Sequence, residues 1–119
     1  MDTIAAIATG SQVSAIGIVR VSGPEAAALM DRVFSPADGK PMSAHGDRKL
    51  VYGALRAADG AVLDYCLCTL SRAPRSYTGE DTAELQCHGS PVVLAEAGVT
   101  LLVFPGSRTA HVPYGDVIV

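Results

Sequence analysis

The chain has 119 residues, of which 49% are hydrophobic and 18% charged, and its formal net charge is −3. This length fits one domain, and this composition carries enough apolar surface to exclude a wholly disordered chain. The nine Lys and Arg residues are scattered and only 5% of the residues are aromatic, so neither an electrostatic footprint for nucleic acid nor a base-stacking platform is expected.

Three further features bound the function. No segment approaches the roughly 18 apolar residues of a membrane span, and the apolar stretch at residues 4–8 lacks a basic leader, so we expect a cytoplasmic protein without membrane contact. Three cysteines are an odd set, which argues against a disulfide framework and fits a reducing compartment. The phosphate-binding pattern G-x-x-x-x-G-K-[ST] does not occur, so the chain by itself is not expected to hydrolyse GTP or ATP.

The first part of the chain predicts two strands and a helix. Residues 3–9 and 16–22 are short runs rich in β-branched side chains, which is typical of strands. Ser22-Gly23-Pro24-Glu25 then supplies a hydroxyl cap and a proline suited to the first turn of a helix over residues 26–34. Residues 36–47 are rich in Pro, Gly, Ser and Asp and predict a surface connection.

The middle of the chain predicts a hairpin. Residues 50–55 and 62–70 are β-like runs on either side of Ala58-Asp59-Gly60, and an Asp-Gly pair favours a tight turn because glycine accepts a positive φ. Residues 72–81 predict a loop, and residues 82–87 alternate in the manner of another strand.

The last part predicts a short helix and a buried strand. Gly89-Ser90-Pro91 begins a helix that ends before Gly98, and residues 99–104 form a compact apolar run. Residues 107–119 show no clear period. The interleaved strands and helices indicate an α+β domain in which helices cover a mixed β-sheet.

Three segments together resemble one family. They are Asp2-Thr3-Ile4-Ala5-Ala6-Ile7-Ala8-Thr9 with A-I-G-I-V-R-V-S-G at 15–23, S-Y-T-G-E-D at 76–81, and E-L-Q-C-H-G-S-P-V-V-L at 84–94. In this order and spacing they resemble the amino-terminal domain of the MnmE/TrmE family of tRNA modification GTPases. The resemblance implies a folate-binding-like domain over residues 1–97, with residues 98–119 as an atypical tail of the same domain.

The resemblance carries expectations about fold and function. It implies a fold similar to the folate-binding domain of the glycine-cleavage aminomethyltransferase, and a homodimer that binds 5-formyltetrahydrofolate or a related tetrahydrofolate. The family adds an aminomethyl-type group to carbon 5 of the wobble uridine, so an MnmG-type flavin protein and tRNA are the implied partners. The family's GTPase part has no counterpart in these residues, and we do not expect this chain alone to be catalytic.

Two charged residues are the candidate cofactor-binding residues. The resemblance assigns folate contacts to the arginine of I-V-R-V-S-G and to the glutamate after S-Y-T-G-E-D, which are Arg20 and Glu84 here. A carboxylate can accept the adjacent N–H groups of a pterin edge, and a guanidinium suits the carboxylates of a folate tail; which end each residue takes stays open. Each alone could be a solvated strand residue, but Arg20 lies in an otherwise apolar strand, where a charge needs a partner or a ligand.

Other functions remain as alternatives. The third folate contact of the family is a lysine near the end of the domain, and no lysine follows Lys49 in this chain. The main alternative is therefore a dimeric interaction domain that has lost folate binding. A third possibility is an independent folate-dependent one-carbon enzyme, but no Ser-His-Asp, Cys-His or paired-acid arrangement stands out to support it.

Cysteine and histidine side chains raise the question of a metal. Cys66, Cys68, Cys87 and His88 are all of zinc-ligand types. Only one residue separates Cys66 from Cys68, which is shorter than the usual zinc spacing, so buried thiols are favoured and no metal is expected. His88 is assigned to the turn before the predicted helix. The loop at residues 77–81 is either an ordinary turn or a ligand-contacting loop.

Overall fold

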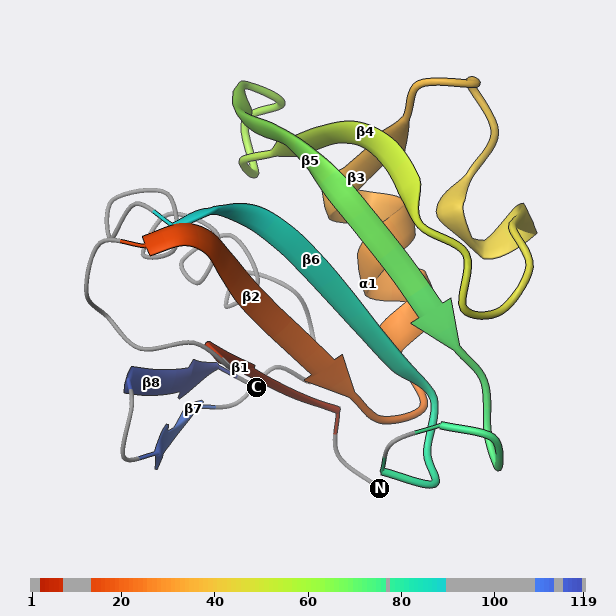
Figure 1. The fold of residues 1–119 in the computed structure, drawn as a ribbon, viewed down its shortest axis with the longest axis vertical. Coiled ribbons are helices and arrows are strands. Elements are labelled where there is room, and N and C mark those ends of the chain that lie inside the picture. The colour runs from red at the N-terminus through yellow and green to blue at the C-terminus, as the bar shows by residue number, and fades with distance from the viewer. Residues whose placement is uncertain (1–2, 8–13, 77, 90–108, 113–114, 119) are drawn as a thin grey trace.

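The computed structural model describes residues 3–7, 14–76, 78–89, 109–112 and 115–118. Within them the chain forms eight strands, one α-helix and one short 3-10 helix (Figure 1). In chain order these are β1 (Ile4–Ile7), β2 (Ser14–Ser22), α1 (Ala26–Val33), β3 (Phe34–Pro36), η1 (Met42–Ala44), β4 (Val51–Arg56), β5 (Val62–Ser71), β6 (Thr82–Gly89), β7 (Thr109–Val112) and β8 (Gly115–Ile118).

The described strands form one sheet in the order β3-β4-β5-β6-β2-β1-β8-β7. Every pairing is antiparallel. The α+β class is confirmed, but the expected mixed sheet is wrong for the part of the chain that is described. Short connections such as the turn between β4 and β5 allow only antiparallel pairing, because a parallel pair needs a crossover of a dozen or more residues.

The predicted hairpin is confirmed. Its strands β4 and β5 lie within one residue of the expected ends, and the turn between them is closed by Ala57 N–H donating to the Ala61 carbonyl at 2.8 Å. Gly60 has a φ of 89°, which is the left-handed conformation that the Asp-Gly signal anticipates.

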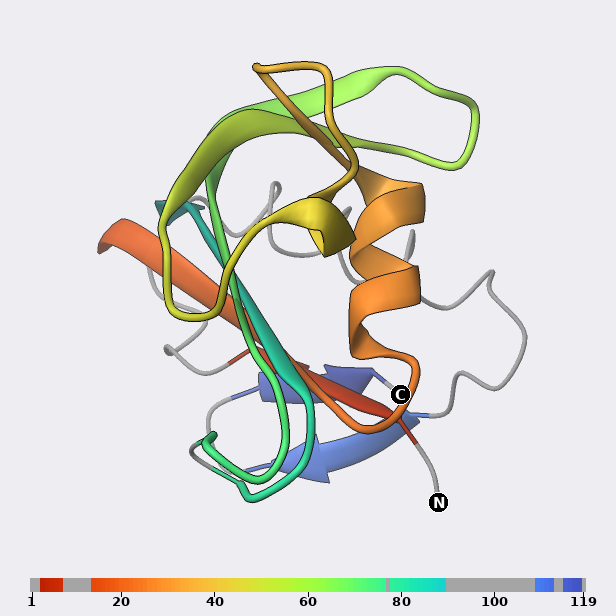
Figure 2. The same ribbon diagram turned by 90° about the vertical axis from the view of Figure 1, so that its right-hand side faces the viewer.

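The predicted helix is confirmed, except at its last residue and at its cap. Its N-cap is Glu25, without a side-chain cap hydrogen bond, and the hydroxyl of Ser22 bonds instead to the loop at 78–80. Helix α1 lies on the concave side of the curved sheet (Figure 2) and buries Ala26, Leu29, Met30 and Val33. Phe34, predicted to continue the helix, instead begins β3 and lies opposite Leu55 of β4. Pro36 explains the stop, because the residue before a proline is disfavoured in the helical conformation.

The connection predicted at residues 36–47 is more than a surface loop. Met42, in η1, is fully buried and belongs to the core. The backbone N–H of Ser43 donates to Asp31 Oδ1 of α1 at 2.8 Å, which holds this turn against the helix. A single buried residue leaves no period in a sequence, so the pattern could not reveal it.

Alternation along the strands separates two faces of the sheet. One face turns Val19 and Val21 of β2 and Ala83, Leu85 and Cys87 of β6 toward the core beneath α1. Because successive strand side chains point to opposite faces, the residues between these belong to the other face, which we call the outer face. The outer face carries Arg20 and Glu84.

Several predicted features lie outside the described residues: Tyr77, the helix from residue 91 and the strand at 99–104. In the predicted tail, β8 pairs with β1, with Ala5 opposite Ile118. Among the described residues, no helix has the length and apolar character that a membrane crossing requires.

Candidate functional site

The two predicted cofactor-binding residues meet on the outer face. Strands β2 and β6 pair so that Arg20 lies directly opposite Glu84. Arg20 Nε donates to Glu84 Oε1 at 2.9 Å, and Arg20 Nη2 lies 2.7 Å from the same oxygen. The two side chains are 31% and 24% exposed, so the pair is half-buried and still accessible.

A shallow open pocket of about 270 Å³ adjoins this pair. Its lining is mostly polar and comes from three parts of the chain: Arg48 and Leu50 before β4, Thr69 and Ser71 of β5, and Thr82 and Glu84 of β6. Glu84 therefore belongs both to the ion pair and to the pocket. Sequence reasoning missed the other lining residues; the alternation of β5 could have placed Thr69 and Ser71 on one face, but no local signal marks Arg48.

The position of Arg48 is set by the backbone. Its φ of 58° is in the left-handed region, and its N–H donates to the Leu70 carbonyl of β5 at 2.7 Å. Its guanidinium donates from Nη1 to the Arg75 carbonyl at 3.0 Å. These contacts hold a second cationic side chain at the pocket, on the side opposite to β2.

Hydrogen bonds join the S-Y-T-G-E-D loop to the end of β2. Ser22 Oγ donates to Glu80 Oε2 at 3.0 Å and shares a 2.8 Å hydrogen bond with Thr78 Oγ1. Because Ser22 has one hydroxyl proton, Thr78 must be the donor in the second bond. Gly23 N–H also donates to the Asp81 carbonyl at 2.8 Å. The described part of this loop thus has a structural role, which is to close over the turn that follows β2.

Aromatic side chains lie on the outer face farther along the sheet. Tyr52 of β4 and Tyr65 of β5 are diagonal neighbours whose rings stack with centroids 6.4 Å apart. They are 55% and 57% exposed, and Leu50 beside the pocket is 57% exposed. Large apolar side chains are therefore available to solvent on the same face as the ion pair.

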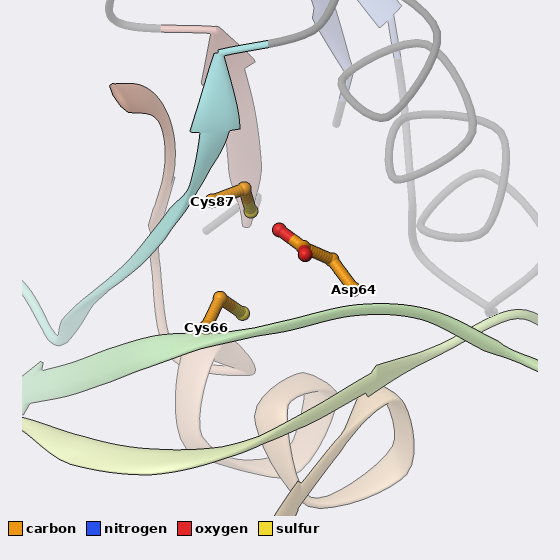
Figure 3. A group of neighbouring side chains, drawn as sticks. All are labelled: Asp64, Cys66 and Cys87. Carbon is orange, nitrogen blue, oxygen red and sulfur yellow. The ribbon is translucent and has the colours of Figure 1, made fainter. Parts of the chain in front are cut away.

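The three cysteines are free and buried, as the spacing favoured. Cys68 lies deep in the core, and its burial raises the pKa of its thiol. A hydrogen bond with the Cys87 thiol, together with burial, raises the pKa of Cys66. Figure 3 shows that Cys66 and Cys87 approach each other with Asp64, and the three ligand atoms lie within 4.8 Å of one another.

His88 is part of β6 and not of a turn, which corrects the prediction. Its backbone N–H donates to Asp64 Oδ2 at 2.9 Å, and its Nδ1 lies 2.7 Å from Asp64 Oδ1. The imidazole is exposed, whereas the Asp64 side chain is only 10% exposed. Nothing in the sequence marks Asp64, because one acid on a strand is usually a solvated residue.

The fold and the site define a small α+β domain that holds a helix on one face of an antiparallel sheet and a charged pocket on the other. A family model described as GTP-binding protein TrmE N-terminus matches residues 3–112. The chain belongs to this family. The match continues beyond residue 94, where the recognised motifs end.

Curated relatives agree with the family. A tRNA modification GTPase MnmE from Bacteroides thetaiotaomicron is 46% identical over 111 residues, covering 92% of this chain and 23% of the relative. The enzyme of the same name from Symbiobacterium thermophilum is 43% identical over 93 residues, covering 78% and 20%. That from Phocaeicola vulgatus is 36% identical over 141 residues, covering 92% and 28%.

This chain differs in length from these relatives in two ways. The chain spans between 20% and 28% of the length of each of these relatives. The alignment with the Phocaeicola vulgatus relative is longer than the chain itself, so that relative carries residues with no counterpart here.

Proposed function

We propose that this chain is the folate-binding and dimerising module of a tRNA modification GTPase, and that Arg20 and Glu84 contact the folate. The observation that carries the proposal is the meeting of these two residues at an open pocket on the outer face. Family membership supplies the class of ligand, 5-formyltetrahydrofolate or a related tetrahydrofolate. On the same basis, the assembly acts on carbon 5 of the wobble uridine with an MnmG-type flavin protein.

The hydrogen-bonding capacity of Glu84 supports this proposal. Arg20 Nε donates to Oε1, and Arg20 Nη2 lies against the same oxygen. Within the described part of the chain, Glu84 Oε2 makes no hydrogen bond. A carboxylate oxygen held beside the hydroxyls of Thr69, Ser71 and Thr82 can accept an N–H from a pterin edge. Arg20 would then fix the orientation of the carboxylate.

Arg48 is a candidate for the cationic contact that the family makes with a lysine. It lines the pocket together with Glu84, and its guanidinium can pair with a carboxylate in two parallel hydrogen bonds. The pocket volume lies slightly below the roughly 300–1,000 Å³ of typical ligand sites, so it fits one end of a folate and leaves the other end over the open sheet.

Calorimetric titration with 5-formyltetrahydrofolate tests the proposal. We expect the wild-type chain to bind, and Glu84→Gln and Arg20→Ala to bind at least about tenfold more weakly, since hydrogen bonds to charged groups contribute about 1.5–3 kcal/mol. Gln86→Ala, at the next outer-face position of β6, is the matched control and should retain wild-type affinity. Circular dichroism establishes that each variant is folded.

Two results would reject the folate site. One is the absence of a binding signal with the folded wild-type chain. The other is wild-type affinity in both Glu84→Gln and Arg20→Ala, which would place any binding elsewhere. The second candidate function, a dimeric interaction domain that has lost folate binding, would then be the better reading, and the exposed Leu50, Tyr52 and Tyr65 favour it.

A further inference from the structure

We propose that Asp64, Cys66 and Cys87 form a binding site for a thiophilic divalent ion such as Zn²⁺. The site is separate from the outer-face pocket, because it lies on the side of the sheet that faces α1. Its starting point is geometric: two thiol sulfurs and a carboxylate oxygen lie within 4.8 Å of one another (Figure 3).

The strand register explains why these groups meet. Leu67 of β5 lies opposite Gln86 of β6, so Cys66 and Cys87 follow as the next facing pair on the core side. Facing residues of an antiparallel pair have Cβ atoms about 4.5–5.5 Å apart. Asp64 precedes Cys66 by two residues on the same strand and therefore shares its face. All three ligands come from two paired strands, so the cluster needs no loop to assemble it.

The chemistry of the three groups suits zinc. Thiolate sulfur and carboxylate oxygen are both zinc ligands, and the ion binds as Cys66 and Cys87 each release their thiol proton to solvent. A soft donor pair selects zinc over magnesium or calcium. The Asp64 side chain is only 10% exposed, and each of its two oxygens already accepts a hydrogen bond from His88. A carboxylate oxygen has two lone pairs, so each oxygen keeps one with which it can bind an ion. Three protein ligands leave the fourth tetrahedral position for water or a further group.

His88 supports the carboxylate from the outside. Its backbone N–H and its imidazole both reach Asp64, at 2.9 and 2.7 Å. Hydrogen bonds of this kind fix the orientation of a ligating carboxylate and contribute to metal affinity. Cys68 differs from the other two cysteines: it is equally buried but is not part of the cluster, so it provides a matched control.

Cobalt titration tests the site. The purified chain, kept reduced with a phosphine, is titrated with Co²⁺, and thiolate coordination is followed by sulfur-to-cobalt charge-transfer absorption. We expect saturation at one ion per chain and displacement of Co²⁺ by Zn²⁺. Cys66→Ser, Cys87→Ser and Asp64→Asn should each weaken Co²⁺ binding by at least about 100-fold, since loss of an outer partner alone costs about 10–100-fold.

The controls make the outcome decisive. Cys68→Ser should keep both the charge-transfer absorption and the affinity. The proposal is overturned if the folded wild-type chain gives no such absorption, or if Cys68→Ser weakens binding as much as Cys66→Ser. If the cysteine variants fail to fold, Asp64→Asn tests the site in their place. A folded Asp64→Asn chain that binds Co²⁺ with wild-type affinity would overturn the proposal, because Asp64 would then not be a ligand.

Discussion

At the scale of single residues, the ion pair between Arg20 and Glu84 is better suited to binding than to stability. The two side chains remain partly exposed, and pairs of this kind contribute about 0–1 kcal/mol to folding. Their replacement should therefore leave the fold intact, which makes the binding variants interpretable. The neighbouring Ser22 is different, because it is buried and takes part in two side-chain hydrogen bonds.

We expect Ser22→Ala to lower the free energy of unfolding by about 1–2 kcal/mol, because net contributions near 1 kcal/mol are typical of each hydrogen bond lost. Urea denaturation followed by circular dichroism measures this change. Ser43→Ala, an exposed serine on η1, is the control and should stay within about 0.5 kcal/mol of wild type. A Ser22→Ala chain as stable as the control would show that Thr78 and Glu80 do not hold the loop.

At the scale of elements, the close approach of β3 and β4 depends on one glycine. A Cβ at Gly53 would lie 2.8 Å from Phe34 Cζ and from Pro36 Cα, and closer still to the Ser35 carbonyl oxygen. Backbone atoms form most of this contact, so a side chain at this position would push the two strands apart. The sequence predicts a strand here, but not that its neighbour would be a three-residue strand beginning at Phe34, the last residue of the predicted helix.

Gly53→Ala should destabilise the chain by about 1–3 kcal/mol, the usual cost of overpacking. Chemical denaturation gives the value, and amide exchange at Phe34 and Leu55 should rise because the pairing of β3 with β4 is disturbed. Gly46→Ala is the matched control, since its added Cβ would meet only the Lys49 side chain at 3.5 Å or more. Equal stability of the two variants would contradict the tight contact.

At the scale of the whole molecule, the two faces of the sheet have different chemistry. The core face is covered by α1 and built from aliphatic and thiol side chains, with Phe34 as the buried aromatic residue among those described. The outer face carries the charged pocket and the stacked Tyr52 and Tyr65. An exposed apolar surface of this kind is typical of an interface.

We expect the chain to be a dimer in solution. Light scattering coupled to gel filtration should give about twice the 12.2 kDa of one chain. Tyr65→Lys should shift the distribution toward the monomer, because it places a charge on the exposed apolar part of the outer face. Arg32→Ala is the control. Arg32 belongs to α1, which covers the opposite face of the sheet, so this variant should keep the molar mass of the wild-type chain. A monomer at high concentration would count against dimerisation in both candidate functions.

The sequence by itself determined the local elements and the family. The Asp-Gly turn, the helix and the alternating strands follow from interactions between near neighbours, and motifs alone point to Arg20 and Glu84. The tertiary structure decided what depends on pairing between distant strands. Strand register brought Arg20 to Glu84 across 64 positions of sequence and gathered Asp64, Cys66 and Cys87, while the left-handed backbone of Arg48 set its side chain at the pocket. Such contacts have no local pattern, because the register of a sheet is fixed by the packing of its whole buried face.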